Sequence, residues 1–511
     1  MKKFVNTRLW LLAVLSLALL TSCRNKLPEG YTLPALPVIP ANEVSLTDFG
    51  AVPDGTTLCT DAFVQALSQL EAMGGGTLQV PSGQWLTGPI VLGSHICLNV
   101  QEGATVLFCP ELPLYATRDE LFCTGEKKHQ APICAFHATD IAITGRGVID
   151  GGGDHWRPVR KEYATDEEWA ALVADTVNGV LNENQTRWMP IRQDERAYCE
   201  AHPIEHRGEV VSWIHYKEHT RPENLWLYEC ERVLIEGVTF QNSPMWNLHP
   251  ELCRDLTLRQ VTSKNEWFAT NGDGLDMESC SHVYVTDCTF DVGDDAICLK
   301  SGADEAGRLR GRPTEEVLVE DCRVFHAHGG FVVGSEMSGG VRNVWVRRCA
   351  FEGTDSGLRF KTNRQRGGLV ENIYVEDVSM YKIKADALLF DMYYHGQSPV
   401  LEEMQGHSIS DTLQVEVSES TPCFHGIHFK DLYCIEVGRT FYFDGLRESP
   451  VQDITLQNVN SWATSPSLFS ECQGIKIENL YLDSRGNQEV YMYHADGIDA
   501  DPDSWAYLKD L

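Results

Sequence analysis

A short apolar motif recurs along most of the chain, and this repeat limits the possible folds more than any other feature. Each copy starts with alternating apolar and polar residues, passes a turn residue and ends in a second short strand-like segment. Copies start mostly 21 to 34 residues apart, at Val233, Leu256, Val283, Val317, Val344, Ile373, Ile427, Ile454 and Ile475, with an earlier copy at Ile141. One copy cannot bury its inner face alone, so the copies must stack around a shared core. The pattern predicts an all-β fold, a right-handed parallel β-helix.

Two segments depart from the repeat. Residues 61–72 have helical apolar spacing and end before the glycines at 74–76, which predicts a short N-terminal helix. Residues 155–225 interrupt the repeat, and Thr165–Glu168 within them is a capping-box signature. We expect this segment to be a helical and irregular insertion on the coil. Residues 43–511 are therefore predicted to form one β-helix domain.

Three cysteines occupy the same place in three copies of the repeat. Cys288, Cys322 and Cys349 each follow their repeat start by five residues. A metal or redox cluster is one interpretation, and a ladder of buried thiols that pack as small apolar groups is the other. Val378 and Leu432 occupy the equivalent place in later copies, which favours plain packing.

The N-terminus has the features of an export signal. A basic start precedes an apolar run from Leu9 to Leu20, which is shorter than the roughly 20 residues needed to span a bilayer. We predict a signal peptide over residues 1–22. The four residues that end in Cys23 resemble a bacterial lipobox, which implies lipid attachment to the Cys23 sulfur. Residues 23–42 contain four prolines and are predicted to be an extended tether.

These features predict a secreted, lipid-anchored protein in the periplasm or on the surface of a Gram-negative bacterium. The membrane is then a partner only through the lipid anchor. The 42 Lys and Arg against 73 Asp and Glu give a formal charge of −31, which repels phosphate backbones and excludes general nucleic-acid binding. We expect the protein to be a monomer.

The densest carboxylate grouping lies in two neighbouring copies of the repeat. Asp273 and Asp276 belong to one copy, and Asp294 and Asp295 to the next. Adjacent coils are about 4.8 Å apart, so these side chains can meet on one outer face, with a bend at Gly293. Crowding raises the pKa of at least one carboxyl, as the acid catalyst of a glycosidase requires. Clustered aspartates also suit calcium, and that alternative stays open.

A cationic segment follows the carboxylates. In Arg359-Phe360-Lys361, alternation predicts that both cations face outward while Phe360 packs inside. Residues 300–366 carry 12 Lys and Arg against 9 Asp and Glu, in contrast to the acidic whole. Such a patch suits an anionic sugar, although an ordinary solvated strand is the alternative. His328, about two turns of the coil from Asp273, is predicted to lie on the same face.

The carboxylate, histidine and cationic segments together resemble the polygalacturonase family, glycoside hydrolase family 28. With the lipobox-like N-terminus, the chain resembles a bacterial lipoprotein-type member of that family. The family carries four ordered segments, and the matching segments here are Asn271-Gly272-Asp273, Gly293-Asp294-Asp295, Ala327-His328-Gly329 and Arg359-Phe360-Lys361. The resemblance implies inverting hydrolysis of α-linked galacturonic acid bonds in pectin, on a right-handed β-helix, with no metal or other cofactor. The partner is then a pectic polysaccharide or an oligogalacturonide.

The resemblance also implies a role for each catalytic residue. Asp294 is the expected general acid, and Asp273 and Asp295 are expected to activate the attacking water. His328 is expected to support the protonation of the acid and the placement of the sugar.

Three further residues are expected to bind substrate. Arg359 and Lys361 bind the galacturonate carboxylate at the cleavage subsite, and Asn271 orients the first catalytic carboxylate. Gly272 and Ala327 differ from the usual family residues, but neither change removes a charged group.

Two other functions remain open from the sequence. A calcium-dependent pectate lyase can use the same coil, and so can a carbohydrate-binding β-helix without catalysis. Within the hydrolase interpretation, the pectin region that is cut is open and includes rhamnogalacturonan. Exo action is favoured if the insertion at 155–225 closes one end of the groove.

Overall fold

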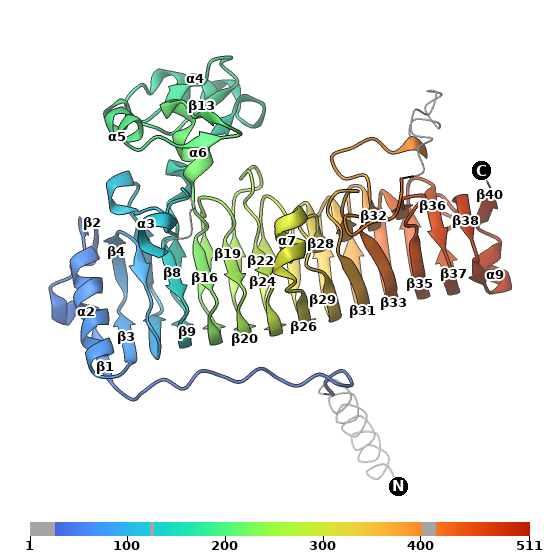
Figure 1. Cartoon of the computed structure of the whole chain (residues 1–511), viewed down its shortest axis with the longest axis horizontal. Helices are drawn as coiled ribbons and strands as arrows, with labels where there is room; N and C mark the ends of the chain where they lie inside the picture. The colour runs from blue at the N-terminus through green and yellow to red at the C-terminus, as the bar shows by residue number, and fades with distance from the viewer. Residues whose placement is uncertain (1–25, 123–126, 401–414, 511) are drawn as a thin grey trace, which may run out of the picture. The chain divides into compact units, whose positions relative to one another are not determined.

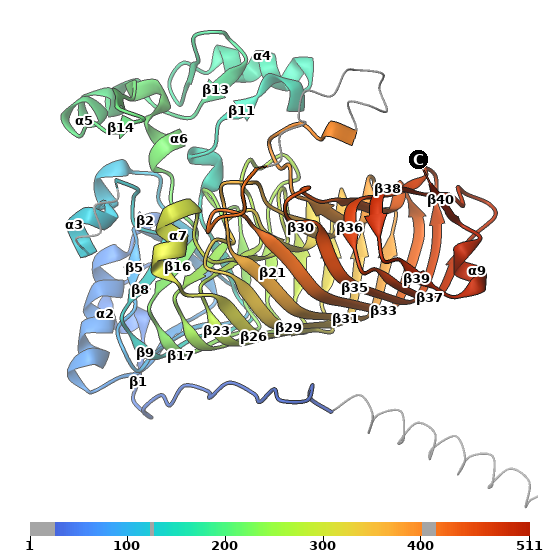
Figure 2. The same ribbon diagram turned by 45° about the vertical axis from the view of Figure 1, so that its right-hand side comes forward.

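The computed structural model describes residues 26–122, 127–400 and 415–510, and residues 34–511 make up one compact unit. Its main sheet contains 35 strands, all paired in parallel, that wind into successive turns of a right-handed β-helix (Figures 1 and 2). The predicted fold class is confirmed. The signal peptide and Cys23 lie outside the described residues. Within the described residues, no helix is both long and apolar enough to cross a membrane.

The strands stack in three ladders that run along the coil. Ladder A carries the candidate site and consists of β5 (Ile90–Val91), β8 (Ile133–Phe136), β16 (Leu225–Tyr228), β19 (Leu248–Glu251), β22 (Leu275–Glu278), β25 (Ile297–Lys300), β28 (Gly329–Gly334), β30 (Ser356–Lys361), β32 (Asp386–Asp391), β34 (Arg439–Asp444), β36 (Ser467–Gln473), β38 (Val490–Asp496) and β40 (Leu508–Asp510).

Ladder B contains the alternating apolar segments of the sequence repeat. It consists of β1 (Glu43–Ser45), β3 (Gly76–Val80), β6 (Ile96–Val100), β9 (Thr139–Gly145), β17 (Glu231–Glu236), β20 (Arg254–Arg259), β23 (Ser281–Thr286), β26 (Thr314–Glu320), β29 (Val341–Glu352), β31 (Leu369–Tyr381), β33 (Cys423–Val437), β35 (Val451–Ala463), β37 (Lys476–Leu482) and β39 (Asp499–Ala500).

Ladder C is the shortest and ends where its strands merge with those of ladder B in β29. It consists of β2 (Asp54–Leu58), β4 (Gly83–Thr87), β7 (Ala104–Phe108), β10 (Val148–Asp150), β18 (Thr239–Gln241), β21 (Thr262–Lys264), β24 (Thr289–Asp291) and β27 (Arg323–Phe325).

The register of ladder B confirms the predicted repeat. Val233 pairs with Ile141 on one side and with Leu256 on the other. The same alignment continues through the predicted starts Val283, Val317, Val344, Ile373, Ile427 and Ile454. These residues are almost fully buried, so each repeat start supplies one layer of the continuous core.

The cysteine ladder is an interior packing feature, as predicted. Cys288, Cys322 and Cys349 are each at most 3% exposed. Cys349 pairs in register with Val378, which in turn pairs with Leu432. Three thiols followed by two aliphatic side chains therefore stack at one core position.

Helices lie outside the three ladders. The predicted N-terminal helix is confirmed as α2 (Thr60–Ala72), which buries Phe63 and Leu70 at the first turns of the coil. Short helices also occur in loops and at the C-terminal end: α3 (Arg118–Phe122), α7 (Asp304–Arg310) and α9 (Pro502–Trp505).

The insertion leaves ladder C after β10 and returns to ladder A at β16. The predicted capping box begins α4, where the Glu168 amide donates to Thr165 Oγ1 over 3.2 Å and the Thr165 amide donates to Glu168 Oε2 over 2.8 Å. Besides helices, the insertion contains two small antiparallel sheets. Its elements are β11 (Val159–Arg160), α4 (Asp166–Ala174), β12 (Val180–Leu181), β13 (Arg187–Met189), α5 (Arg196–Ala201), β14 (Glu205–His206), β15 (Glu209–Val210) and α6 (Tyr216–Thr220).

Candidate active site

The predicted catalytic residues come from three consecutive turns at ladder A. Asp273 lies just before β22, Asp294 and Asp295 just before β25, and His328 directly before β28. The Gly274 amide donates to the Asp295 carbonyl over 2.8 Å, and the His328 amide donates to the Asp294 carbonyl over 2.9 Å. The parallel stacking therefore brings residues 55 positions apart in sequence onto one stripe of the coil.

The three carboxylates converge as the sequence predicted. Asp273, Asp294 and Asp295 each offer an oxygen that lies within 4.8 Å of the others. Asp273 and Asp295 are buried, whereas the Asp294 side chain is 20% exposed at the edge of a cleft. Asp294 is thus the carboxyl of this trio that is most open to a ligand.

Asp295 is held by the two cations of β30. Arg359 Nη1 donates to Asp295 Oδ1 over 3.2 Å, and Lys361 Nζ donates to Asp295 Oδ2 over 2.6 Å. Burial alone would raise the pKa of Asp295, but the charges of Lys361 and Arg359 outweigh it and hold the pKa well below its ordinary value. Asp295 therefore stays ionised, and two cations against one anion leave a surplus positive charge.

Asp273 has a different environment. Burial raises its pKa well above the ordinary value, and the nearby charges of Asp276 and Asp294 raise it further. Its Oδ1 is buried and has no hydrogen-bond partner among the described residues. A buried carboxylate oxygen without a donor is costly, so a water bound there would stabilise the site.

His328 contacts the exposed member of the trio. Its Nδ1 lies 3.0 Å from Asp294 Oδ1, and its Nε2 lies 4.0 Å from Asp355 Oδ2. The hydrogen bond to Asp294 raises the pKa of His328 above its ordinary value, although partial burial opposes the shift. His328 therefore keeps its proton to a higher pH than a free histidine does.

Asn271 lies in the same loop but contacts a residue that the sequence did not identify. Its Oδ1 accepts a hydrogen bond of 2.8 Å from Arg221 Nη2, while Arg221 Nη1 donates to the carbonyls of Pro244 and Thr270. Arg221 lies near the end of the insertion, and its position does not follow the spacing of the repeat. That Asn271 orients Asp273 stays a prediction.

Sequence reasoning also missed a second buried charge cluster behind the trio. Lys300 Nζ lies 3.5 Å from Asp276 Oδ1 and 3.0 Å from Glu336 Oε2. Burial raises the pKa of Asp276 to about 7, against the opposing effect of Lys300. The sequence did contain a signal for this cluster. Lys300 is the last residue of β25 and follows Cys298 by two positions, so the two side chains lie on the same face of the strand.

An aromatic residue covers the cation pair. Lys361 Nζ lies 4.9 Å from the centre of the Tyr394 ring, and Arg359 Cζ lies 5.6 Å from it. Tyr394 follows β32, and no pattern in the sequence marks it. Phe360, between the two cations, packs in the core and stacks on Phe390 at 4.5 Å, as the alternation predicted.

The catalytic cleft is a cavity of about 900 Å³ beside the trio. Asp294, His328 and Tyr394 line it, and the insertion contributes Arg160 and Tyr163. Tyr163 packs edge-to-face on Trp267, with ring centres 5.3 Å apart. The insertion therefore forms part of the wall of the catalytic cleft.

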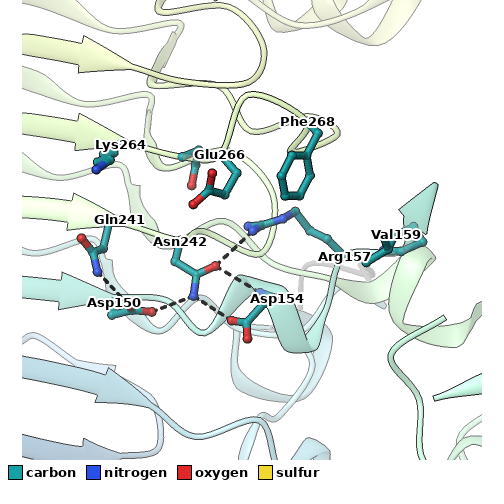
Figure 3. Close-up of a pocket in the computed structure, with 11 residues that line it drawn as sticks. Asp150, Asp154, Arg157, Val159, Gln241, Asn242, Lys264, Glu266 and Phe268 are labelled. Atoms are coloured by element: carbon teal, nitrogen blue, oxygen red, sulfur yellow. Dashed lines mark hydrogen bonds between the residues drawn. The ribbon is translucent and has the colours of Figure 1, made fainter. Parts of the chain in front are cut away.

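A second cavity of about 500 Å³, the side cleft, adjoins the first (Figure 3). Both are lined by Lys264, Asn265, Glu266 and Phe268, so the two clefts share these residues as a wall. Asp150, Asp154 and Arg157 contribute further polar walls.

Comparison with known proteins identifies the family. A model described as glycosyl hydrolases family 28 matches residues 201–423. The chain is also similar to the hyperthermoactive exopolygalacturonase of Thermotoga maritima, with 31% identity, 92% of this chain and 94% of that chain covered, and a TM-score of 0.64. The chain belongs to glycosyl hydrolases family 28. It is therefore a glycosidase.

Other relatives of this family 28 chain are more distant. A probable polygalacturonase of Vitis vinifera is 28% identical over 82% of this chain and 74% of that protein. An exo-poly-alpha-D-galacturonosidase of Dickeya chrysanthemi is 25% identical over 69% of this chain, which spans 57% of that longer protein.

Proposed function

We propose that this family 28 protein is an inverting hydrolase of α-linked galacturonic acid bonds in pectin. The observation that carries the proposal is the convergence of Asp273, Asp294 and Asp295 on Arg359 and Lys361. Acid, base and carboxylate recognition then lie within one site. The names of the most similar proteins, an exopolygalacturonase among them, support the substrate class.

Asp294 acts as the general acid. It lines the catalytic cleft and lies 3.0 Å from His328 Nδ1, so it can donate to the leaving glycosidic oxygen and recover a proton through the imidazole. The exposed position favours Asp294 over the two buried carboxylates for this role.

Asp273 acts as the general base. Its unpartnered Oδ1 is suited to the attacking water, and Asp273 lies within reach of the other two carboxylates of the trio. Asp295, held ionised by Arg359 and Lys361, helps to orient that water and stabilises the positive charge that develops on the sugar.

Inversion rests on family membership rather than on the carboxylate separation. Inverting enzymes commonly place the two carboxyls about 6.5–9.5 Å apart, whereas the nearest oxygens here lie within 4.8 Å. Two oxygens at that distance can share one water, which is the nucleophile that inversion requires.

The cation pair recognises the substrate carboxylate. Arg359 and Lys361 together carry one more positive charge than Asp295 neutralises, and they lie beneath Tyr394 beside the catalytic cleft. A planar guanidinium and an ammonium next to an aromatic ring suit an anionic sugar ring.

Exo action follows from the insertion. Arg160 and Tyr163 line the catalytic cleft, so the insertion restricts the path of a long chain. Similarity to an exopolygalacturonase supports the same conclusion. Long oligomers that appear early in a digest of polygalacturonate would contradict it.

The export features extend the proposal to location. The lipobox-like sequence at Cys23 supports a location outside the cytoplasm, on a lipid anchor.

A calcium-dependent lyase is the second candidate, because the three carboxylates lie close enough to share a cation. Both oxygens of Asp295 already contact Arg359 or Lys361, and these charges repel a divalent ion. The donor set therefore favours hydrolysis.

Substitution of the acid tests the function. Asp294→Asn should lower kcat on oligogalacturonate by about 10²- to 10⁴-fold while the affinity for the oligomer, measured calorimetrically, is retained. Asp287→Asn, at an exposed turn of the same repeat, is the matched control. An inactive wild type that binds the oligomer would indicate a carbohydrate-binding protein, and activity that a chelator abolishes would indicate the lyase.

A further inference from the structure

Near its end, the insertion carries an arginine that contacts the loop of the proposed catalytic base. Arg221 directly follows α6, and its side chain reaches residues 269–273, here called the base loop, which lead into β22. Asp273 is the last residue of the base loop. Arg221 thus joins the insertion to the segment that carries the base.

The guanidinium of Arg221 binds three acceptors in two turns of the coil. Its Nη1 donates to the carbonyls of Thr270 and Pro244 over 2.8 and 2.9 Å, and its Nη2 donates to Asn271 Oδ1 over 2.8 Å. Thr270 and Asn271 belong to the base loop, whereas Pro244 precedes β19 in the turn before it. A planar guanidinium can hold several acceptors in fixed directions, which an ammonium does less well.

Arg221 is also a buried charge. Its side chain belongs to a residue that is 5% exposed, and no carboxylate forms an ion pair with it within the described part of the chain. Burial lowers the pKa of Arg221 to about 10, against the opposing charges of nearby carboxylates that include Asp273, so Arg221 stays charged at neutral pH. Because a buried charge is costly unless it is hydrogen-bonded, the three acceptors stabilise the side chain in one position.

The base loop depends on such external support. Asn271 has a φ of +53°, in the left-handed region that is uncommon for residues other than glycine. Beyond Asn271, the Asn265 side chain donates to the Gly272 carbonyl over 3.0 Å, and the Asn247 amide donates to the Asp273 carbonyl over 2.9 Å. These contacts hold the second half of the base loop, and Arg221 holds the first half.

The insertion in turn fixes Arg221. Tyr216 of α6 is 1% exposed and packs in the hydrophobic core of the insertion. Lys217 Nζ donates to the Pro190 carbonyl over 3.0 Å and lies 3.0 Å from Glu195 Oε1. The Arg221 amide donates to the Lys217 carbonyl over 2.8 Å, so the arginine starts from a well-anchored backbone.

We propose that Arg221 is a positioning residue for the catalytic base. It fixes the base loop so that Asp273 Oδ1 meets the attacking water in the productive geometry. The insertion then contributes to catalysis as well as to the wall of the cleft. The inference rests on the proposed function, in which Asp273 is the base. Displacement of a reacting group by about 1 Å can lower a rate by about 10²-fold.

Substitution of the arginine separates positioning from binding. Arg221→Gln should lower kcat on trigalacturonate by about 100-fold, because the base loop loses its support. KM should change by less than about threefold, because the variant leaves Arg359 and Lys361 untouched. Arg221→Lys keeps the charge but reaches only part of the acceptors, so kcat should fall less, by about tenfold.

Lys217→Gln is the matched control, at a buried cation of α6 whose printed contacts stay within the insertion. It should lower the melting temperature but leave kcat within about twofold of wild type at a temperature where all variants are folded. An equal fall in kcat in Lys217→Gln, an unchanged kcat in Arg221→Gln, or a rise in KM as large as the fall in kcat overturns the inference. If Arg221→Gln does not fold, the comparison of Arg221→Lys with Lys217→Gln decides between the outcomes. In each of these cases, hydrolysis by wild type leaves the proposed function standing, whereas a wild type inactive on every oligogalacturonate overturns the proposed function itself.

Discussion

The three clustered aspartates have different neighbours, although they are residues of one type. Asp295 is ionised because Lys361 and Arg359 contact it, whereas burial and like charges raise the pKa of Asp273. Asp294 contacts His328 and faces the cleft. This division of one residue type into acid and base is what general acid–base catalysis requires.

The His328–Asp294 pair predicts the alkaline side of the pH profile. The pKa of His328 is raised by Asp294, so the pair keeps its proton below that pKa and loses it, with activity, as the pH rises through it. His328→Gln removes the imidazole that holds this proton, so the alkaline limb of kcat should move to lower pH. We expect kcat at the optimum to fall by about 10- to 100-fold.

The measurement is kcat against pH for wild type and variant on one oligogalacturonate. His326→Gln provides a control at an exposed neighbouring histidine that contacts Asp291 instead. An unchanged alkaline limb in His328→Gln would mean that His328 does not hold the catalytic proton.

At the scale of the element, β30 joins the core to the site. Phe360 stacks on Phe390 inside the coil, and the residues on either side of it carry the cations that contact Asp295. Strand alternation thus fixes the position of Arg359 and Lys361 through the packing of their neighbour.

Truncation of Phe360 tests whether core packing fixes the position of the two cations. Phe360→Ala should lower the free energy of unfolding by about 3–5 kcal/mol and raise KM, because the cations lose their rigid support. Phe469→Ala, in the core behind β36, is the matched control and should lower stability similarly with a smaller effect on KM. Denaturant titration and kinetics at a temperature where both variants are folded give the comparison. An equal rise in KM for both would contradict the link.

At the scale of the whole molecule, the regular coil and the presence of the insertion were predictable, but the contacts that the insertion makes were not. The repeat starts identified in the sequence are the residues that pair in ladder B, because each coil must bury the same face. Arg157 and Arg221 lie 64 residues apart at the two ends of the insertion, outside any period. Their contacts with the cleft loops depend on tertiary packing alone.

The charge distribution also belongs to this scale. In a chain with a formal charge of −31, Arg359 and Lys361 of ladder A place two cations against the carboxylate trio. The repeat predicted which residues of ladder A meet, but not that Asp295 would neutralise part of the cation pair, since burial depends on the loops.

Proton NMR of the products during hydrolysis of trigalacturonate tests the central claim most directly. Water delivered by Asp273 opposite Asp294 predicts that the new reducing end first appears as the β anomer and then equilibrates, with no unsaturated product. A first product in the α configuration, or an unsaturated product that absorbs in the ultraviolet, would contradict the account.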